Sequence, residues 1–588
     1  MILQALTSLY EALAQKGEIS KEGWSREKIS FALSIDEEGN LLRVTPLFDT
    51  VDGPKGKTRE VPQKMMVPAA VKRTSGAAAN FLWDNSSYIL GVSLKKGEDD
   101  AEREKRRNKD IKCFEACLEL HHSMLDGMEY PAAKAVLNFL DKWEPQKAEE
   151  NNLVAQYAKE ILSGANMVFR FNGGYVHDDP QLASVWQKAN AKQKDNIGQC
   201  LVTGALDEIQ KTHPTIKGVQ GAQSSGAALV SFNASAFCSY NKEQNQNAPV
   251  GKYAAFAYTT ALNHLLADRK NVHRIGDASV VCWAENADKQ YEDFAAEVFF
   301  GDNVDKSDEQ RLSALRTSLK LLADGLPCKE MDLDPDRKFY ILGLSPNAAR
   351  IAVRFFYCDS FGKIAGNIYR HHERLEIVRP SYDKFPILPL WKLLSATVNP
   401  NAKDKTPNAA MAGAVARAVF SGGRYPASLL ECTFLRIKAE RNITRERAAI
   451  IKAYYLRNPN EKCPKEVLTV SLNENSKNIP YTLGRLFSVY EEIQQAANPG
   501  INTTIKDRYF GSAAAMPATV FPILSNLAQK HLRKLSDAQR VYLDKKVMTL
   551  KSVLGEQYPA HMSLPEQGSF DLGYYHQTQA RYTKKEDK

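Results

Sequence analysis

Residues 427–458 read ASLLECTFLRIKAERNITRERAAIIKAYYLRN, with apolar side chains at the three- and four-residue spacing of an α-helix. The same spacing continues toward the C-terminus, where Leu543, Val547, Leu550 and Leu554 recur along one helical side. Strand-like patterns are sparse after about residue 381. The sequence therefore predicts an all-α C-terminal region that ends in a helical bundle.

Local sequence patterns place the ends of two helices in this bundle. Pro480 stands where proline is favoured, in the first helical turn, and Asn498, Pro499 and Gly500 terminate the same helix. Ser536 followed by Gln539 predicts a capping box at the start of a later helix.

Residues 1–380 mix two kinds of pattern. Short strand-like runs separated by turn residues are ISFALSID, SYILGV, ALVSF, SVVCWA and FYILGL, and helical stretches lie between them. The fold class predicted is α+β, a large mixed α/β N-terminal body followed by the all-α region. We expect three parts: the body at 1–380, a helical connector at 381–465, and a C-terminal bundle at 466–588.

Length and charge limit the function classes. A chain of 588 residues is long enough for several cores, and 78 Lys and Arg against 69 Asp and Glu give a net charge of +9. This mild excess indicates a localised basic surface. We expect no membrane span and no secretory signal, and nine scattered cysteines fit mostly buried thiols in a reducing cytoplasm. The predicted location is cytoplasmic.

A glycine-rich polar segment lies at 202–240, VTGALDEIQKTHPTIKGVQGAQSSGAALVSFNASAFCSY. Its glycines allow tight turns, and its uncharged donors and acceptors suit base edges or a sugar-phosphate strand. Those side chains are Gln220, Gln223, Ser224, Ser225 and Asn233. The segment contains no strong general acid or base, so we expect a loop that reads a ligand without reacting with it. The alternative is an ordinary polar hairpin tip.

Two sets of cations stand among small or apolar residues. Lys72, Arg73 and Thr74 gather two charges and a hydroxyl at a predicted turn, which suits a phosphate or base edge, or else only solvates a strand edge. Arg350 and Arg354 are four residues apart on an expected helix. They could project toward an acidic strand or toward a carboxylate within the protein.

Several enzymatic patterns are incomplete. GPKGKT at 53–58 lacks the first glycine of a P-loop, and AQSSG at 222–226 precedes a strand-like run where a nucleophile elbow requires a helix. An NTPase is therefore rejected, and a serine hydrolase is disfavoured.

Histidine-containing patterns raise the possibility of metal chemistry. Cys113, Cys117 and His121 span about 12 Å of helix, too far for one zinc ion, so we interpret them as a half-buried helix face. His177, Asp178 and Asp179 leave a metal-dependent nuclease as the rival hypothesis, although no companion ligand pattern completes the site. We expect the His371 and His372 pair to lie in a basic surface segment.

Six separated blocks together resemble one family. They are MILQALTSLYEAL, VPAAVKRTSGAAANFLWDNSSYILGV, the segment from VTGALDEI to SYNKEQNQNAPV, FYILGLSPNAARIAVRFF, FSGGRYPASLL with FLRIKAERN, and QGSFDLGYYHQTQ. In this order they resemble the Csd family, the large subunit of the type I-C CRISPR Cascade complex. The resemblance covers essentially the whole chain.

The resemblance implies a non-catalytic subunit of an RNA-guided complex, with no cofactor and no metal. Such a subunit would recognise a protospacer-adjacent motif in double-stranded DNA, promote strand opening and R-loop formation, and stabilise the displaced strand. Implied partners are double-stranded target DNA, CRISPR RNA, the backbone, handle-binding and small Cascade subunits, and a helicase-nuclease recruited after R-loop formation.

The resemblance also suggests roles for particular residues. Motif reading would fall to Lys72, Arg73, Thr74, Gln220, Gln223, Ser224, Ser225 and Asn233. DNA backbone or displaced-strand contacts would fall to Arg350, Arg354, Lys530, Arg533, Lys534, Arg540, Lys545 and Lys546. Besides the nuclease, a purely structural scaffold subunit stays open as an alternative.

Overall fold

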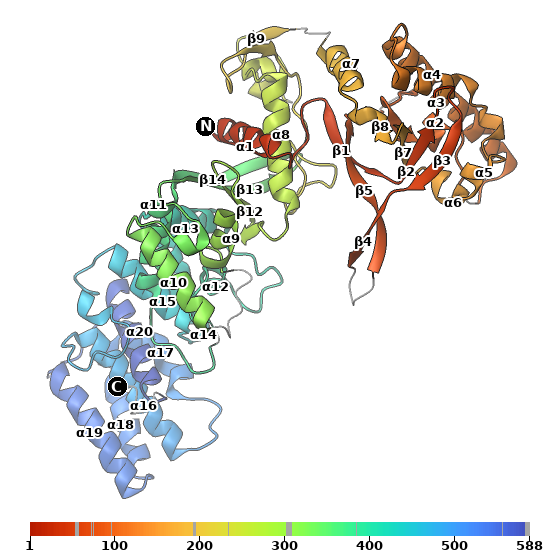
Figure 1. Ribbon diagram of the computed structural model, residues 1–588. Coiled ribbons are helices and arrows are strands. Elements are labelled where there is room, and N and C mark those ends of the chain that lie inside the picture. The colour runs from red at the N-terminus through yellow and green to blue at the C-terminus, as the bar shows by residue number, and fades with distance from the viewer. Residues whose placement is uncertain are drawn as a thin grey trace. The chain divides into compact units, whose positions relative to one another are not determined.

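The computed structural model describes residues 1–52, 58–71, 73, 76–95, 97–191, 196–232, 234–301, 309–383, 385–555 and 557–582 (Figure 1). The chain forms two compact units. The first consists of Met1, Leu3–Thr212 and Phe232–Thr260, and the second of Ile2, His213–Ser231 and Ala261–Lys588.

The first unit is built on two sheets. In one, β2 (Phe31–Ile35) pairs with β3 (Leu41–Pro46) and lies parallel to β7 (Asn166–Phe171), which also pairs with β6 (Trp83–Asn85) and β8 (Gly174–Tyr175). In the other, β5 (Thr58–Pro68) lies between β1 (Trp24–Ile29) and β4 (Phe48–Asp52). Helices α3 (Asp100–Leu125) and α4 (Pro131–Lys142) pack on each other, and α4 covers β2 and β7 (Figure 1).

Shorter elements complete the first unit. They are α1 (Ile2–Gln15), α2 (Ser86–Ile89), α5 (Asn152–Ala155), α6 (Ala158–Ile161), α7 (Pro180–Ala191), β9 (Ile197–Gln199), β10 (Leu206–Glu208), η2 (Pro145–Lys147), η3 (Val176–Asp178), η4 (Ser235–Phe237) and η5 (Gln244–Asn247). Helix α8 (Lys252–Ala267) contributes residues to both units.

The second unit begins with an antiparallel sheet. Its strand order is β11 (His273–Ile275), β12 (Ala278–Ala284), β13 (Lys338–Asn347) and β14 (Arg350–Ser360). Every residue of β12 is buried, as expected for an apolar strand covered on both faces. The covering helices are α9 (Lys289–Val298), which contacts β12, and α11 (Phe361–Leu375) and α13 (Ala409–Ser421), which contact β14.

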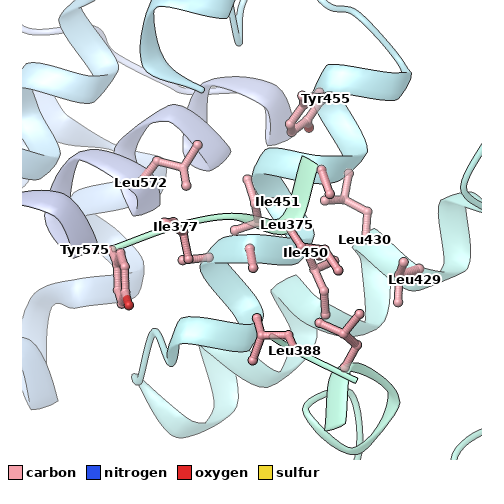
Figure 2. Packing of buried hydrophobic residues seen from close by; sticks show 14 of the residues in the cluster. Leu375, Ile377, Leu388, Leu429, Leu430, Ile450, Ile451, Tyr455, Leu572 and Tyr575 are labelled. Atoms are coloured by element: carbon pink, nitrogen blue, oxygen red, sulfur yellow. The ribbon is translucent and has the colours of Figure 1, made fainter. Parts of the chain in front are cut away.

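The rest of the second unit is helical. Its elements are α10 (Glu309–Ala323), α12 (Leu390–Ser395), α14 (Ala427–Glu440), α15 (Arg445–Arg457), α16 (Ile479–Ala497), α17 (Ile505–Ala515), α18 (Pro517–Leu532), α19 (Asp537–Leu554), α20 (Leu564–Gln579), η6 (Lys329–Met331) and η7 (Lys465–Val467). One hydrophobic core runs from the sheet to α20. Figure 2 shows part of it, where side chains of α14, α15 and α20 meet Leu375, Ile377 and Leu388.

Helix α16 is the centre of the C-terminal bundle, since it packs against α17, α18, α19 and α20 (Figure 1). It approaches α20 at two glycines. A Cβ atom on Gly484 would lie 1.9 Å from the Phe570 carbonyl oxygen, and one on Gly573 would lie 2.1 Å from that of Tyr481. The two helices therefore touch through their backbones, which only residues without a side chain permit.

The predicted α+β class, with sheets before an all-α end, is confirmed. The helix start at Pro480 is also confirmed, with proline in the first turn of α16. Six of the nine cysteines are buried and all nine are free, in agreement with buried thiols.

Several local predictions are wrong. SYILGV forms helix α2 and a turn, and ALVSF at 228–232 contributes only an isolated bridge at Ala228. RIAVRFF, expected as helix, is strand β14, because Ala348 adopts a left-handed φ of 52° that turns the chain back on β13. Ser536 makes no capping bond to the backbone of α19.

Candidate nucleic-acid interface

The predicted reading loop lies in the second unit, and its two ends meet at a backbone bridge. Ile216 and Ala227 form an antiparallel bridge in which each backbone N–H donates to the other carbonyl at 2.9 Å. The intervening residues, 217–226, form turns that begin and end at this bridge. The loop therefore has a fixed base even though no strand precedes or follows it.

Neighbouring elements attach both sides of the loop. The Lys217 N–H donates to Asn263 Oδ1 at 2.8 Å, and the Gln220 N–H donates to Ser279 Oγ of β12 at 3.1 Å. On the other side Ala228 bridges β14, since it donates to the Ala349 carbonyl at 3.1 Å and accepts from the Ile351 N–H at 2.9 Å. Sheet and helix α8 thus hold the backbone of the loop in place.

Gly226 is required at the closing turn. Its φ is +101°, a conformation that residues with a side chain rarely adopt, and a Cβ there would lie 2.8 Å from Thr215 Cβ and Oγ1. The glycine therefore lets the two arms of the loop meet closely.

The polar side chains of this loop face solvent. Gln220, Gln223, Ser224 and Ser225 are all exposed, and none of these side chains has a hydrogen-bond partner among the described residues. Two amides and two hydroxyls on an anchored backbone can donate and accept hydrogen bonds to base edges or phosphates. Asn233 lies outside the described residues.

Arg73 is held by its own unit. Its guanidinium pairs with Asp84 Oδ2, its Nε donates to the Ala78 carbonyl at 2.8 Å, and it lies 4.0 Å from the centre of the Tyr88 ring. Burial raises the pKa of Asp84, against the opposing effects of Arg73 and of N–H groups from Asn80 and Asn85. Lys72 and Thr74, like the GPKGK segment at 53–57, lie outside the described residues.

Arg350 and Arg354 lie at the start and middle of β14. Pairing with β13 shifts between Gly343 and Leu344, so that Arg354 is the extra residue of a β-bulge. One Nη of Arg354 contacts Asp277 Oδ2 at 2.6 Å, with Arg354 still 36% exposed. Of the two roles left open for it, the contact with a carboxylate of the same protein is present.

The C-terminal cations line α18, α19 and the turn between them. Lys530, Arg533, Lys534, Arg540 and Lys545 are exposed. Arg540 pairs with Asp537 at 2.7 Å, and Lys546 lies between Glu492 at 3.5 Å and the Tyr542 ring at 4.4 Å. Exposed cations on consecutive helices form a basic surface suited to a nucleic-acid backbone.

The geometry does not gather a metal site at His177, Asp178 and Asp179. His177 is buried, with its Nε2 3.7 Å from the exposed Asp178, while Asp179 accepts N–H groups at the start of α7. No group of three or more His, Cys, Asp or Glu side chains among the described residues could hold a metal ion.

The other histidine patterns are structural. Cys113, Cys117 and His121 line the buried face of α3, as predicted. His121 Nε2 accepts from the Leu82 N–H at 3.0 Å, and burial lowers its pKa to about 4. The surface position expected for His371 is wrong, because this ring is buried in α11, 2.7 Å from the Tyr425 hydroxyl.

The comparisons with known proteins identify the family. A family model described as CRISPR-associated protein (Cas_Csd1) matches residues 6–582. The chain belongs to the Cas_Csd1 family. Among curated proteins, none matches this chain.

Membership of Cas_Csd1 confirms the resemblance to the type I-C Cascade large subunit. It places the protein among CRISPR-associated Cascade subunits, which associate with further Cascade components and CRISPR RNA. In the part of the chain that the structure describes, no helix is both long and apolar enough to cross a membrane.

Sequence reasoning missed the residues that hold these candidate side chains in place within each unit. Ser279 and Asn263 fix the loop, Asp84 holds Arg73, and Asp277 pairs with Arg354. Ser279, Asn263 and Asp277 each lie far along the chain from their partners. Asp84 lies only eleven residues after Arg73, and its carboxylate within the apolar run FLWDN is a signal that the sequence contains.

Proposed function

We propose that this Cas_Csd1 protein is the non-catalytic subunit that recognises a protospacer-adjacent motif in double-stranded DNA. In this role it promotes strand opening and R-loop formation, stabilises the displaced strand and supports recruitment of the helicase-nuclease. The observation that carries the proposal is the anchored loop at 217–226, whose side-chain amides and hydroxyls are exposed and have no partner among the described residues.

The side chains of this loop favour recognition of DNA bases over catalysis. Glutamine amides pair with base edges through two hydrogen bonds, and each such pair discriminates against a wrong base by about 1–3 kcal/mol. The backbone anchors reduce the entropy lost when the loop orders on DNA. Lys72, Arg73, Thr74 and Asn233 remain proposed readers, and Arg73 would also shape its turn through Asp84.

The test is a competition assay in which the complete ribonucleoprotein binds duplexes that carry every motif variant. We expect the double variant Gln220→Ala and Gln223→Ala to lose its preference for the best motif by roughly tenfold or more, since two base-edge contacts are removed. The matched control replaces Gln181 and Gln187, two exposed glutamines of α7, by alanine.

Each other outcome of this assay has a defined meaning. An unchanged ranking of motifs in the loop variant would refute motif reading by these side chains. Equal DNA binding by an assembly that lacks this subunit would favour the scaffold alternative. Cleavage that depends on a divalent ion and disappears in Asp178→Ala would favour the nuclease.

Displaced-strand binding is proposed for the exposed cations of α18 and α19, together with Arg350 and Arg354. Replacing Lys530, Arg533 and Lys534 by glutamine should weaken binding about equally for all motifs. Each lost phosphate contact should reduce the slope of log affinity against log salt by about one. The measurement is the salt dependence of duplex binding, and an unchanged slope would exclude these three residues as phosphate contacts.

The division into 1–380, 381–465 and 466–588 is proposed as a division of roles. One hydrophobic core runs across the boundaries at 381 and 466. In this proposal the helical connector and the small-subunit-like bundle contact different partners, although they share one core.

A further inference from the structure

A cavity of about 600 Å³ lies in the second unit between α10, α11 and the segments 376–379 and 386–388. Its apolar lining includes Leu319, Leu375, Ile377 and Leu388, none more than 4% exposed. Figure 2 shows Leu375, Ile377 and Leu388 among the packed side chains of α14, α15 and α20. The floor of the cavity is therefore part of the core.

The polar lining of the cavity is predominantly cationic. Arg316, Lys320 and Arg379 contribute three positive charges, and Arg445 adds a fourth that is paired with Asp383, against two carboxylates from Glu373 and Glu376. The first three are exposed, and their side chains have no hydrogen-bond or ion-pair partner among the described residues. Three free cations around an apolar floor favour a ligand that carries negative charge beside apolar groups.

Arg445 provides a buried donor in this lining. Only 7% of it is exposed, and its terminal nitrogens bond to Asp383, at 2.9 Å, and to the carbonyls of Phe385 and Pro386. Its Nε is buried without a partner in the described structure. Because this nitrogen is buried from solvent, the charge that meets a ligand in the cavity comes from the exposed Arg316, Lys320 and Arg379.

The extended backbone of residues 376–379 is only partly paired. The Val378 N–H donates to the Val470 carbonyl at 2.8 Å, and the Val378 carbonyl accepts from the Tyr575 hydroxyl at 2.7 Å. The backbone groups of Ile377 and Arg379 make no hydrogen bond to any described residue. Unpaired groups along an extended segment resemble those of an edge strand, which can pair with an added peptide.

We propose that this cavity binds an extended peptide segment of another protein subunit, with acidic side chains at Arg316, Lys320 and Arg379 and an apolar side chain on the leucine and isoleucine floor. Its volume lies within the range of ligand sites and accommodates a few side chains. A nucleic-acid strand fits less well, because the floor is aliphatic and, among the described lining residues, only Tyr369 and His372 carry rings that could stack on bases. The inference does not depend on motif reading.

The experiment places the photocrosslinker benzoylphenylalanine at Thr317, an exposed lining residue, in the purified complete ribonucleoprotein. After irradiation, mass spectrometry identifies the crosslinked peptide. We expect a segment of another protein subunit with at least two Asp or Glu residues near an apolar one. A crosslinker at the exposed Lys403 is the control position and should not capture this segment.

Charge reversal tests the role of the cations. The double variant Arg316→Glu and Lys320→Glu should reduce the Thr317 crosslink at least tenfold, whereas Lys403→Glu with Lys405→Glu should leave it unchanged. Far-UV circular dichroism checks folding, and Lys320→Glu alone serves if the double variant misfolds.

Three results would overturn the proposal: crosslinks only to RNA or DNA, no crosslink to another protein, or a crosslink that charge reversal leaves unchanged. Motif-duplex binding is measured on the same preparations. Intact motif reading without the peptide crosslink would reject the cavity proposal alone, and the crosslink without motif reading would reject the proposed DNA role alone.

Discussion

The ion pair of Arg73 and Asp84 joins a half-buried cation to a carboxylate that is only 1% exposed. Asp84 also accepts from the N–H groups of Asn80, at 2.9 Å, and Asn85, at 2.8 Å. A buried carboxylate is tolerated only when its oxygens are paired, so Arg73 contributes to the stability of the first unit whatever it contacts outside.

Replacing Arg73 by alanine is expected to destabilise the first unit by about 3 kcal/mol, because it leaves the Asp84 charge buried without its cation. Adding Asp84→Asn should recover part of this loss. Urea unfolding followed by circular dichroism measures both. The control is Arg540→Ala, which breaks an exposed pair with Asp537 and should cost less than about 1 kcal/mol. Equal midpoints for Arg73→Ala and the wild type would contradict the prediction.

The kinds of side chain in the candidate site could be predicted from sequence, but their partners could not. Exposure of Gln220 and Gln223 follows from their polarity and from the glycines around them. Arg354, in contrast, pairs with Asp277 across 77 positions, and nothing near either residue indicates the other. Such pairs depend on strand register, which local patterns do not contain.

At the scale of elements, the contact between α16 and α20 depends on glycine. Gly484 and Gly573 each face a backbone carbonyl of the other helix at a distance that no Cβ atom could occupy. Around this contact Ser488 and Thr578 hydroxyls lie 2.8 Å apart, and the Tyr574 hydroxyl donates to Glu491 at 2.6 Å. Close backbone approach thus brings buried polar groups within hydrogen-bonding distance.

Gly484→Ala should therefore destabilise the second unit by roughly 3 kcal/mol or more, since the helices must separate to admit one methyl group. Gly511→Ala is the matched control. This glycine also lies within a helix, α17, but nothing stands within 4 Å of a Cβ there. Alanine at 511 should stabilise by about 0.5–1 kcal/mol. Thermal melting compares the two variants, and similar melting temperatures would refute the close-contact explanation.

Helices were more predictable than strands in this chain. The spacing of apolar residues identified the C-terminal helices, because each buries one face over many turns. Short apolar runs were ambiguous, as SYILGV became α2 and RIAVRFF became β14. In such runs the packing partners decide between helix and strand, and β14 is fixed by its pairing with β13.

At the scale of the whole molecule, buried neutral histidines make stability depend on pH. Burial lowers the pKa of His121 to about 4 and that of His576 to about 3, against an ordinary value of 6.5. His121 is 1% exposed and His576 is 0% exposed. Because the folded pKa lies below the unfolded one, their contribution is complete above pH 6.5 and is lost as pH falls toward 4 and 3.

The free energy of unfolding should thus fall by roughly 2 kcal/mol per buried histidine between pH 7.5 and pH 5, and the urea midpoint should decrease with it. Replacing His121 by glutamine should make the decrease shallower. His122 provides a control of opposite sign, because hydrogen bonds to Asp141 and Asp126 raise its pKa. His122→Gln should make the decrease slightly steeper. A midpoint that is constant between pH 7.5 and 5 would contradict this account.

The order of synthesis adds a consequence to the bond between Tyr574 and Glu491, which joins positions 83 residues apart. At the usual rate of translation, α16 leaves the ribosomal exit tunnel on the order of ten seconds before α20 has emerged and can pack against α16. During that interval the nascent polypeptide displays an unpartnered apolar stripe with a carboxylate inside it. Chaperone capture should be strongest in that window, and synonymous codons that slow translation between these helices should increase aggregation.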